Sequence, residues 1–229
     1  MRWPPASSPH TALSLRFRQG QVRSVAAATL AEDPREEEVL AGLLAYSQSN
    51  TTAAELLQHF PSLGHVVSAE PLQLQAFGLT TCDVALLRLV RETACRMAKA
   101  EVRHRPALSN WQAVIAYLQT TMAHEQIEQL RVLFLDRKNH LLADEVQQQG
   151  TVSHTPVYPR EIMKRALILN ASALIVVHNH PSGDPKPSRE DIEMTRQLKA
   201  AAEALDLELY DHVVIGHGRH SSFRSLGLI

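Results

Sequence analysis

The sequence contains few of the residues that mark specialised protein classes. It has two cysteines among 229 residues, and aromatic residues make up only 5% of it. No CxxC pair occurs, which argues against a zinc finger or a zinc deaminase. Cys82 and Cys95 lie thirteen positions apart in one predicted helical region. That is about 20 Å along a continuous helix, which is too far for a disulfide. We expect a reduced, cytoplasmic protein.

Long apolar runs and an excess of one charge are absent as well. No stretch of 18 apolar residues occurs, so we expect no membrane span. The formal net charge is −1, with +1 in residues 1–105 and −2 in residues 106–229. Neither part therefore has the basic footprint that is typical of nucleic-acid binding. Hydrophobic residues make up 45% of the chain, which is enough for a core in which aliphatic side chains dominate.

Hydrophobic periodicity changes near residue 105. The earlier part has helical patterns, and Thr51 and Asp83 are suited to be N-caps of two of its helices. The later part begins with a helical pattern and then alternates between strands and helices. The sequence predicts a helical region over 1–105 and an α/β (α+β) domain over 106–229. The predicted helices span 36–46, 51–60, 83–100, 109–123, 159–169 and 188–205, and the predicted strands span 130–135, 141–147, 174–178, 209–215 and 221–224.

The most informative stretch is residues 178–191, HNHPSGDPKPSRED. It follows a predicted buried strand on which alternate residues share a face, so His178 and His180 project together and Asn179 points away. Ser188 starts the next helix and places Asp191 in its first turn, where a folded-back loop would bring the carboxylate to the imidazoles. Two histidines and a carboxylate with a fourth position left open are typical of catalytic zinc. The sequence therefore predicts a Zn²⁺ site formed by His178, His180 and Asp191.

Each part of this pattern also has a simpler explanation when it is taken alone. Ser188 and Asp191 match the capping-box pattern [ST]-x-x-[DE]. Two histidines at a strand end are often solvated polar residues. His212, at the start of a later predicted strand, either supports the metal site or is an ordinary hydrogen-bonded strand histidine. The combination within one short loop favours the metal site.

The pattern H-x-H-P-x-G-x(3)-P-S-x-x-D in residues 178–191 resembles the signature of the JAMM (MPN+) metalloprotease-like domain. The flanking segments YPRE at 158–161 and DHVVIG at 211–216 make the chain more closely similar to the RadC family, bacterial proteins long labelled as DNA repair factors. The resemblance covers about residues 105–229. It implies a mixed β-sheet flanked by helices, and a zinc-dependent hydrolase that cleaves an amide or isopeptide bond in a peptide or protein substrate.

The resemblance also implies roles for two further residues. JAMM proteins use an upstream glutamate as general base, which the family places four residues before an apolar strand pair. Here that position is Glu128, ahead of Val132-Leu133, and Glu125 is the alternative. Taken alone, both are typical surface glutamates. Ser188 is implied as the hydrogen-bond donor to the developing oxyanion.

RadC-like proteins usually begin with a helix-hairpin-helix segment, whose G-x-G turn binds DNA phosphates through backbone N–H groups. The corresponding residues 74–83, LQAFGLTTCD, keep Gly78 but have Thr80 in place of the second glycine, and Asp83 adds negative charge. We therefore expect a structural helix pair here, with DNA as a weakly supported partner. The alternative function is a non-enzymatic DNA-associated factor with a structural metal site. A fourth protein ligand on the metal would support that alternative, and an open position would support catalysis.

Overall fold

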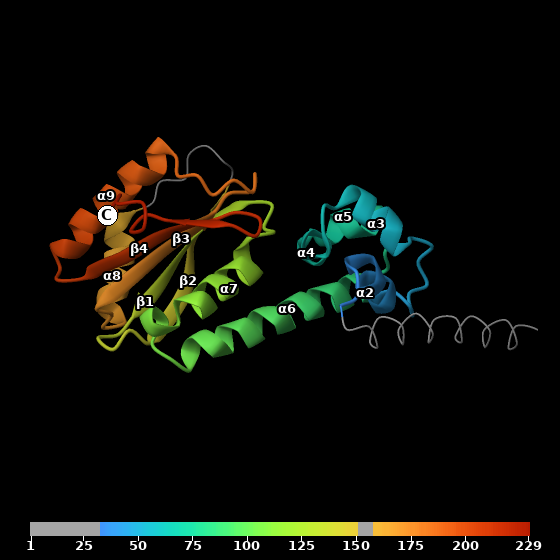
Figure 1. Ribbon diagram of the computed structural model, residues 1–229, viewed down its shortest axis with the longest axis horizontal. Coiled ribbons are helices and arrows are strands. Elements are labelled where there is room, and N and C mark those ends of the chain that lie inside the picture. The colour runs from blue at the N-terminus through green and yellow to red at the C-terminus, as the bar shows by residue number, and fades with distance from the viewer. Residues whose placement is uncertain (1–32, 151–157) are drawn as a thin grey trace, which may run out of the picture. The chain divides into compact units, whose positions relative to one another are not determined.

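The computed structural model describes residues 33–150 and 158–229. Residues 1–32 of the predicted helical region lie outside this description. The chain divides into two compact units within helix α6, between Arg91 and Glu92. The first unit is helical and the second is a mixed sheet interleaved with helices, so the predicted fold class is confirmed (Figure 1). Within the described ranges, no helix combines the length and the apolar character needed to cross a membrane.

The first unit packs short helices around a small aliphatic core. Its fully buried members are Leu40, Leu56, Val66, Leu74 and Leu87. The sequence pattern does not predict α4 and α5, because helices of six residues are too short to give a periodic signal. The helices are α2 (Glu36–Leu43), α3 (Ala53–His59), α4 (Leu63–Ser68), α5 (Pro71–Ala76) and the first part of α6 (Thr81–Arg103).

The starts of α3 and α6 show that two predicted N-caps are wrong. Thr52, not Thr51, caps α3. Thr80 caps α6, because its hydroxyl accepts a hydrogen bond from the Asp83 N–H at 3.3 Å. The buried Asp83 carboxylate accepts one from the Thr80 N–H at 2.8 Å in return, so Asp83 lies inside the helix rather than at its cap. A carboxylate of this chain therefore binds a backbone N–H at the helix start, the kind of position at which helices bind anions.

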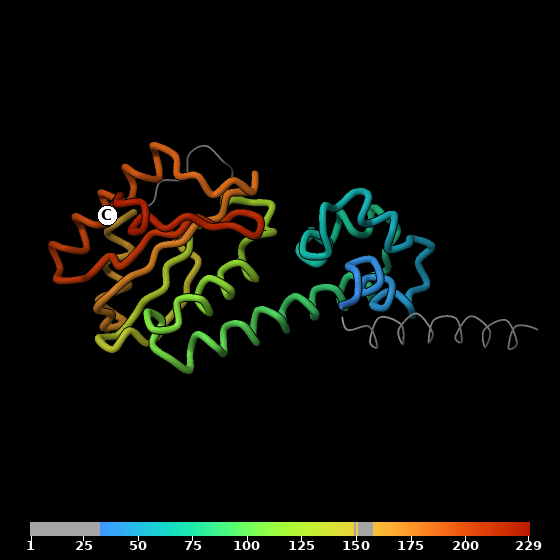
Figure 2. Tube along the Cα trace, in the orientation of Figure 1, coloured from blue at the N-terminus to red at the C-terminus, as the bar shows by residue number. Residues whose placement is uncertain are grey.

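The second unit is built around a five-stranded mixed sheet in the order β2-β1-β3-β4-β5. β1 is antiparallel to both β2 and β3, β3 and β4 are parallel, and β5 is antiparallel to β4. Figure 2 traces the chain through this sheet to the red C-terminal segment. The strands are β1 (Glu128–Leu135), β2 (Leu141–Gly150), β3 (Ala173–Asn179), β4 (Glu208–Ile215) and β5 (His220–Ser222), and the helices are α7 (Trp111–Met122), α8 (Pro159–Ile168) and α9 (Arg189–Glu203), with a 3₁₀ turn at Ala107–Asn110 before α7.

Alternate residues of the central strands pack against helices on opposite faces of the sheet. Leu133 and Val177 belong to the core cluster that contains α7. Val132 and Val176 belong to the cluster that contains α8 and α9. The result is a sheet with α7 on one side and α8 and α9 on the other (Figure 1). This alternation decides on which face each polar residue near the strand ends emerges.

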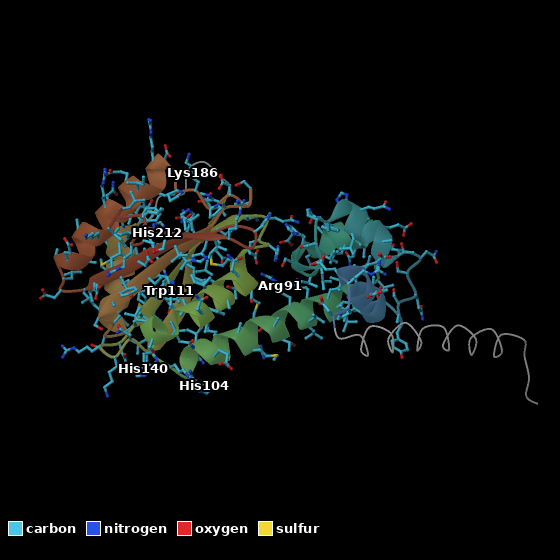
Figure 3. The ribbon with its side chains drawn as sticks, viewed as in Figure 1. Arg91, His104, Trp111, His140, Lys186 and His212 are labelled. Carbon is cyan, nitrogen blue, oxygen red and sulfur yellow. The ribbon has the colours of Figure 1, made fainter. Side chains whose placement is uncertain are left out.

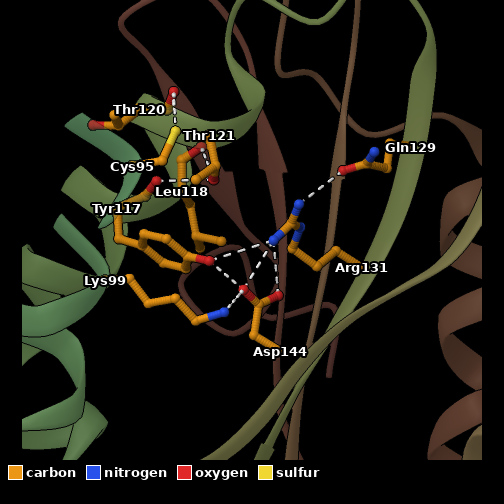
Figure 4. A network of polar contacts seen from close by, with 9 residues as sticks. All are labelled: Cys95, Lys99, Tyr117, Leu118, Thr120, Thr121, Gln129, Arg131 and Asp144. Carbon is orange, nitrogen blue, oxygen red and sulfur yellow. Dashed lines mark hydrogen bonds and ion pairs between the residues drawn. The ribbon is translucent and has the colours of Figure 1, made fainter. Parts of the chain in front are cut away.

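A buried ion-pair network joins α6 and α7 to the β1–β2 hairpin (Figure 4). The Asp144 carboxylate is fully buried. It accepts hydrogen bonds from Arg131 Nη1 at 2.9 Å and from Lys99 Nζ at 3.1 Å. The Tyr117 hydroxyl donates to the same carboxylate, and burial together with Asp144 raises the pKa of this phenol, so it stays protonated. The network therefore fixes β1, the strand that begins at Glu128.

We expect Asp144→Ala to lower the free energy of unfolding of the second unit by about 3 kcal/mol, because it leaves the largely buried Arg131 guanidinium without its partner. Urea denaturation followed by the fluorescence of Trp111, in a Trp3→Phe background, measures this change. The matched control is Glu203→Ala, which removes an exposed carboxylate and costs less than about 0.5 kcal/mol. Equal midpoints for the two variants would show that the network contributes nothing to stability.

Candidate metal centre

The end of β3 presents two histidines on one face of the sheet. Every residue of β3 is buried, and His180 follows directly after the strand. By alternation, His178 and His180 share the face of Val176, which α8 and α9 cover. Their Nε2 atoms lie 3.0 Å apart. The side chain of His178 is 2% exposed and that of His180 is 18% exposed, so solvent reaches the pair from the side of His180.

The loop after His180 leads back to the start of α9, beside these histidines. Ser188 is the N-cap, and its hydroxyl accepts a hydrogen bond from the Asp191 N–H at 3.1 Å. The Asp191 carboxylate accepts one from the Ser188 N–H at 2.7 Å. The same carboxylate lies 3.3 Å from Nε2 of His178 and 3.6 Å from Nε2 of His180. The capping box is therefore present, and it orients the carboxylate towards the imidazoles.

The three side chains together fit a divalent metal ion. One potential ligand atom from each of His178, His180 and Asp191 lies within 4.8 Å of the others. His180 Nδ1 lies 2.7 Å from the carbonyl oxygen of Asp184. A carbonyl can only accept, so Nδ1 carries the proton of the neutral ring and Nε2 directs a lone pair into the group. Two imidazole nitrogens and a carboxylate oxygen match the ligands of open zinc sites, so the predicted residues form a candidate metal-binding group.

The electrostatics of the group also favour a cation. Burial alone would raise the pKa of the Asp191 carboxyl, but the imidazoles of His178 and His180, 3.3 Å and 3.6 Å away, hold that pKa well below its usual range. Asp191 in turn raises the pKa of His180, and the negative charge of Glu128 adds to this effect. The group therefore contains an ionised carboxylate, and Glu128 lies close enough to act on His180.

Glu128 is the first residue of β1, and its charge acts on His180. Leu130 of β1 pairs with His178 of β3, and Glu128 lies two residues before Leu130, at the start of β1. Alternation puts Glu128 on the face of Leu130, which is the face of both histidines. Glu125 precedes β1, in the segment between α7 and the strand.

Asn179 points away from the histidines, as the alternation predicts, and it holds the start of β1. Its Oδ1 accepts a hydrogen bond from the Gln129 N–H at 2.9 Å, and its Nδ2 donates to the Ile127 carbonyl at 3.2 Å. It therefore holds the residues on both sides of Glu128. The sequence gives no signal for this role, because the two segments meet only through the pairing of β1 with β3.

His212 of β4, which is labelled in Figure 3, contacts His178. It is fully buried, and its Nε2 lies 2.8 Å from Nδ1 of His178. The parallel register pairs His212 with Val176, so it lies on the α9 face, where its Nδ1 is 2.6 Å from Oγ1 of Thr195. Burial lowers the pKa of His212 well below its usual value, so the ring is neutral. Of the two sequence interpretations of His212, the contact with His178 favours support of the metal site.

Two glycines allow the loop after His180 to approach the turn after β4. A Cβ on Gly216 would lie 2.2 Å from the Gly183 carbonyl oxygen, and a Cβ on Gly183 would lie 2.5 Å from Nδ1 of His217. Gly183 also has φ +80°, which residues with a side chain rarely adopt. This close approach holds the loop that carries the Asp184 carbonyl, the hydrogen-bond partner of His180.

We expect Gly216→Ala to displace this loop and to weaken metal binding about 10–100-fold, the usual cost of losing the partner of a metal-binding histidine. The added methyl group should also cost about 1–3 kcal/mol of stability through overpacking. Gly218→Ala is the control. A Cβ there meets nothing within 4 Å, although φ is +65°, so it should cost about 1–2 kcal/mol and leave metal affinity unchanged. Equal metal affinities in the two variants would contradict the role of the close approach.

Comparison with known proteins agrees with this geometry. A family model described as the RadC-like JAB domain matches residues 108–228, which is more than half of the chain. The chain belongs to the RadC family. A relative from Rhodobacter capsulatus named UPF0758 protein is 57% identical over 178 residues, covering 77% of this chain and 83% of the relative. The RadC match contains α7, all five strands and the whole candidate metal group, whereas the first unit lies outside it.

Proposed function

We propose that this RadC protein is a zinc-dependent hydrolase of the JAMM type that cleaves an amide or isopeptide bond in a peptide or protein. The proposal is carried by the convergence of His178 Nε2, His180 Nε2 and the Asp191 carboxylate at one strand end. Three protein ligands leave one position of a tetrahedral zinc ion open, which is the arrangement of catalytic zinc. Glu128, beside this group, supplies the proton acceptor that such chemistry needs.

When bound, zinc would polarise a carbonyl and lower the pKa of water to about 7. In our proposal, Glu128 accepts the proton of the attacking water and later delivers it to the leaving nitrogen. The Ser188 hydroxyl accepts from the Asp191 N–H, so its own proton is available to the developing oxyanion. Substrate approaches from the side of His180, the more exposed of the two histidines.

The alternative, a non-enzymatic DNA-associated factor, has less support. The Asp83 carboxylate binds the Thr80 N–H at the start of α6, so this chain itself provides the anion at the hairpin. The net charge of residues 1–105 is only +1. A phosphate contact at this turn would have to displace a buried carboxylate.

A cleavage assay tests the proposed function. A panel of peptides and lysine isopeptides would be incubated with zinc-loaded protein, with chelator-treated protein and with chelator-treated protein reloaded with zinc. We expect newly released amines only where zinc is present, and none from a His178→Ala/His180→Ala variant purified in parallel, which controls for contaminating proteases. Failure of the zinc-loaded protein to cleave any member of the panel would count against the hydrolase.

The coordination of the bound metal provides a second test. X-ray absorption of the zinc-loaded protein should show two histidine nitrogens, one carboxylate oxygen and one further oxygen from solvent. Four protein ligands would indicate a structural site and would contradict the proposed mechanism.

A further inference from the structure

We propose that Thr195 and His212 are positioning residues that fix the tautomer of His178, so that its Nε2 is unprotonated and faces the metal position. This inference rests on the proposed metal site. It adds two residues, one from α9 and one from β4, that lie outside the H-x-H-x(7)-S-x-x-D pattern.

The hydrogen-bond chain begins at the backbone carbonyl of Asp191. The hydroxyl of Thr195, one turn further along α9, donates to this carbonyl at 2.5 Å. A carbonyl oxygen can only accept, and a hydroxyl has a single proton. Thr195 is 1% exposed. Because its only hydroxyl proton goes to the Asp191 carbonyl, its Oγ1 can take part in a second hydrogen bond only as the acceptor.

The donor of that second hydrogen bond is His212, and this decides which of its ring nitrogens carries the proton. Nδ1 of His212 lies 2.6 Å from Oγ1 of Thr195 and must therefore carry the ring's proton. A neutral imidazole has one N–H, so Nε2 of His212 is an acceptor. This nitrogen lies 2.8 Å from Nδ1 of His178, which must then be the donor. The neutral His178 ring is left with an Nε2 lone pair, directed at His180 and Asp191.

If every hydrogen bond in this series ran in the opposite direction, a proton would block the metal position. That direction would put the proton on Nε2 of His178, 3.0 Å from Nε2 of His180, at the position that a metal must occupy. A threonine that donates to the carbonyl four residues earlier is by itself common in helices. Here the carbonyl belongs to Asp191, and the series of hydrogen bonds ends at His178. These hydrogen bonds therefore connect two of the three proposed ligands.

Paired substitutions at Thr195 test this inference. Thr195→Val keeps the shape of the side chain but removes the hydroxyl, and we expect it to weaken zinc binding about 10–100-fold. Thr195→Ser keeps the hydroxyl and should bind zinc within about threefold of the wild-type affinity, well inside the loss expected for a missing partner. Competition with a chromophoric chelator measures both affinities. Wild-type affinity in a folded Thr195→Val variant would overturn the proposal.

A spectroscopic measurement on the unmodified protein gives a second, independent test. Imidazole ¹⁵N chemical shifts of the metal-free wild-type chain, at a pH where the rings are neutral, should report the Nδ1–H tautomer for both His178 and His212. Thr195→Val should convert these signals to a mixture of tautomers. An Nε2–H tautomer of His178 in the wild type would overturn the proposal. Absence of zinc binding by the wild type would instead contradict the proposed function, and the tautomer would still decide the role of Thr195 and His212.

Discussion

Glu128→Gln should reduce turnover by about 10²–10⁴-fold, the usual contribution of a general base. It should leave zinc content and zinc affinity unchanged. Glutamine has the size of glutamate but cannot take up a proton, and Glu128 is not one of the three side chains that converge as ligands. Turnover and zinc content would be measured on the same preparation, with a substrate identified in the cleavage assay.

Glu125→Gln is the matched control, since it makes the same chemical change three residues earlier. Its turnover should stay near that of the wild type, because Glu125 precedes β1, whereas Glu128 lies on β1 and its charge acts on His180. Loss of zinc from Glu128→Gln would make Glu128 a ligand and refute the mechanism. Full activity of Glu128→Gln together with loss in Glu125→Gln would assign the base to Glu125.

The candidate metal ligands could be predicted from sequence because they depend on local structure. A strand end, a proline-rich loop and a helix start all lie within residues 178–191. Strand alternation puts His178 and His180 on one face, and the capping box fixes Asp191 in the first helical turn. The loop length then allows few other arrangements.

The residues behind the ligands could not be predicted in the same way. His212 reaches His178 only because β3 and β4 are parallel neighbours with Val176 paired to His212. Asn179 reaches the start of β1 only through the pairing of β1 with β3. Neither register is visible in the spacing of residues along one sequence. Two interpretations of His212 therefore stay open at the level of sequence. For Asn179, strand alternation predicts which way the side chain points but not what it binds.

The helical region shows a limit of a different kind. The longer helices have an apolar periodicity that predicts them, whereas α4 and α5 have fewer than two turns each. The N-cap of α3 is predicted one residue too early, because Thr51 and Thr52 are adjacent and equally suited to cap a helix. At α6, Thr80 and Asp83 both have the chemistry of a cap, and only their hydrogen bonds show which residue has that role.

His178→Ala/His180→Ala should abolish stoichiometric zinc binding, and Asp191→Asn should weaken it by more than about 100-fold. Loss of a partner behind a ligand already costs about 10–100-fold, and loss of a ligand should cost more. The neutral amide of asparagine is a poorer ligand for a dication than a carboxylate. Metal analysis after equilibrium dialysis against buffered zinc measures both variants. Unchanged zinc content in the double histidine variant would refute the assignment of the site.

Asp191 also belongs to the capping box of α9, so a loss of zinc in Asp191→Asn needs separation from a loss of helix stability. Ser188→Ala provides this separation, because it removes the cap hydroxyl at a cost of about 1 kcal/mol but leaves all three ligands in place. We expect Ser188→Ala to retain zinc and to lose part of the turnover, since it lacks the donor to the oxyanion. Glu190→Gln, a charge removal at the neighbouring exposed position, should change neither quantity. If Ser188→Ala lost zinc as completely as Asp191→Asn, the effect would come from the helix start, and Asp191 would not be established as a ligand.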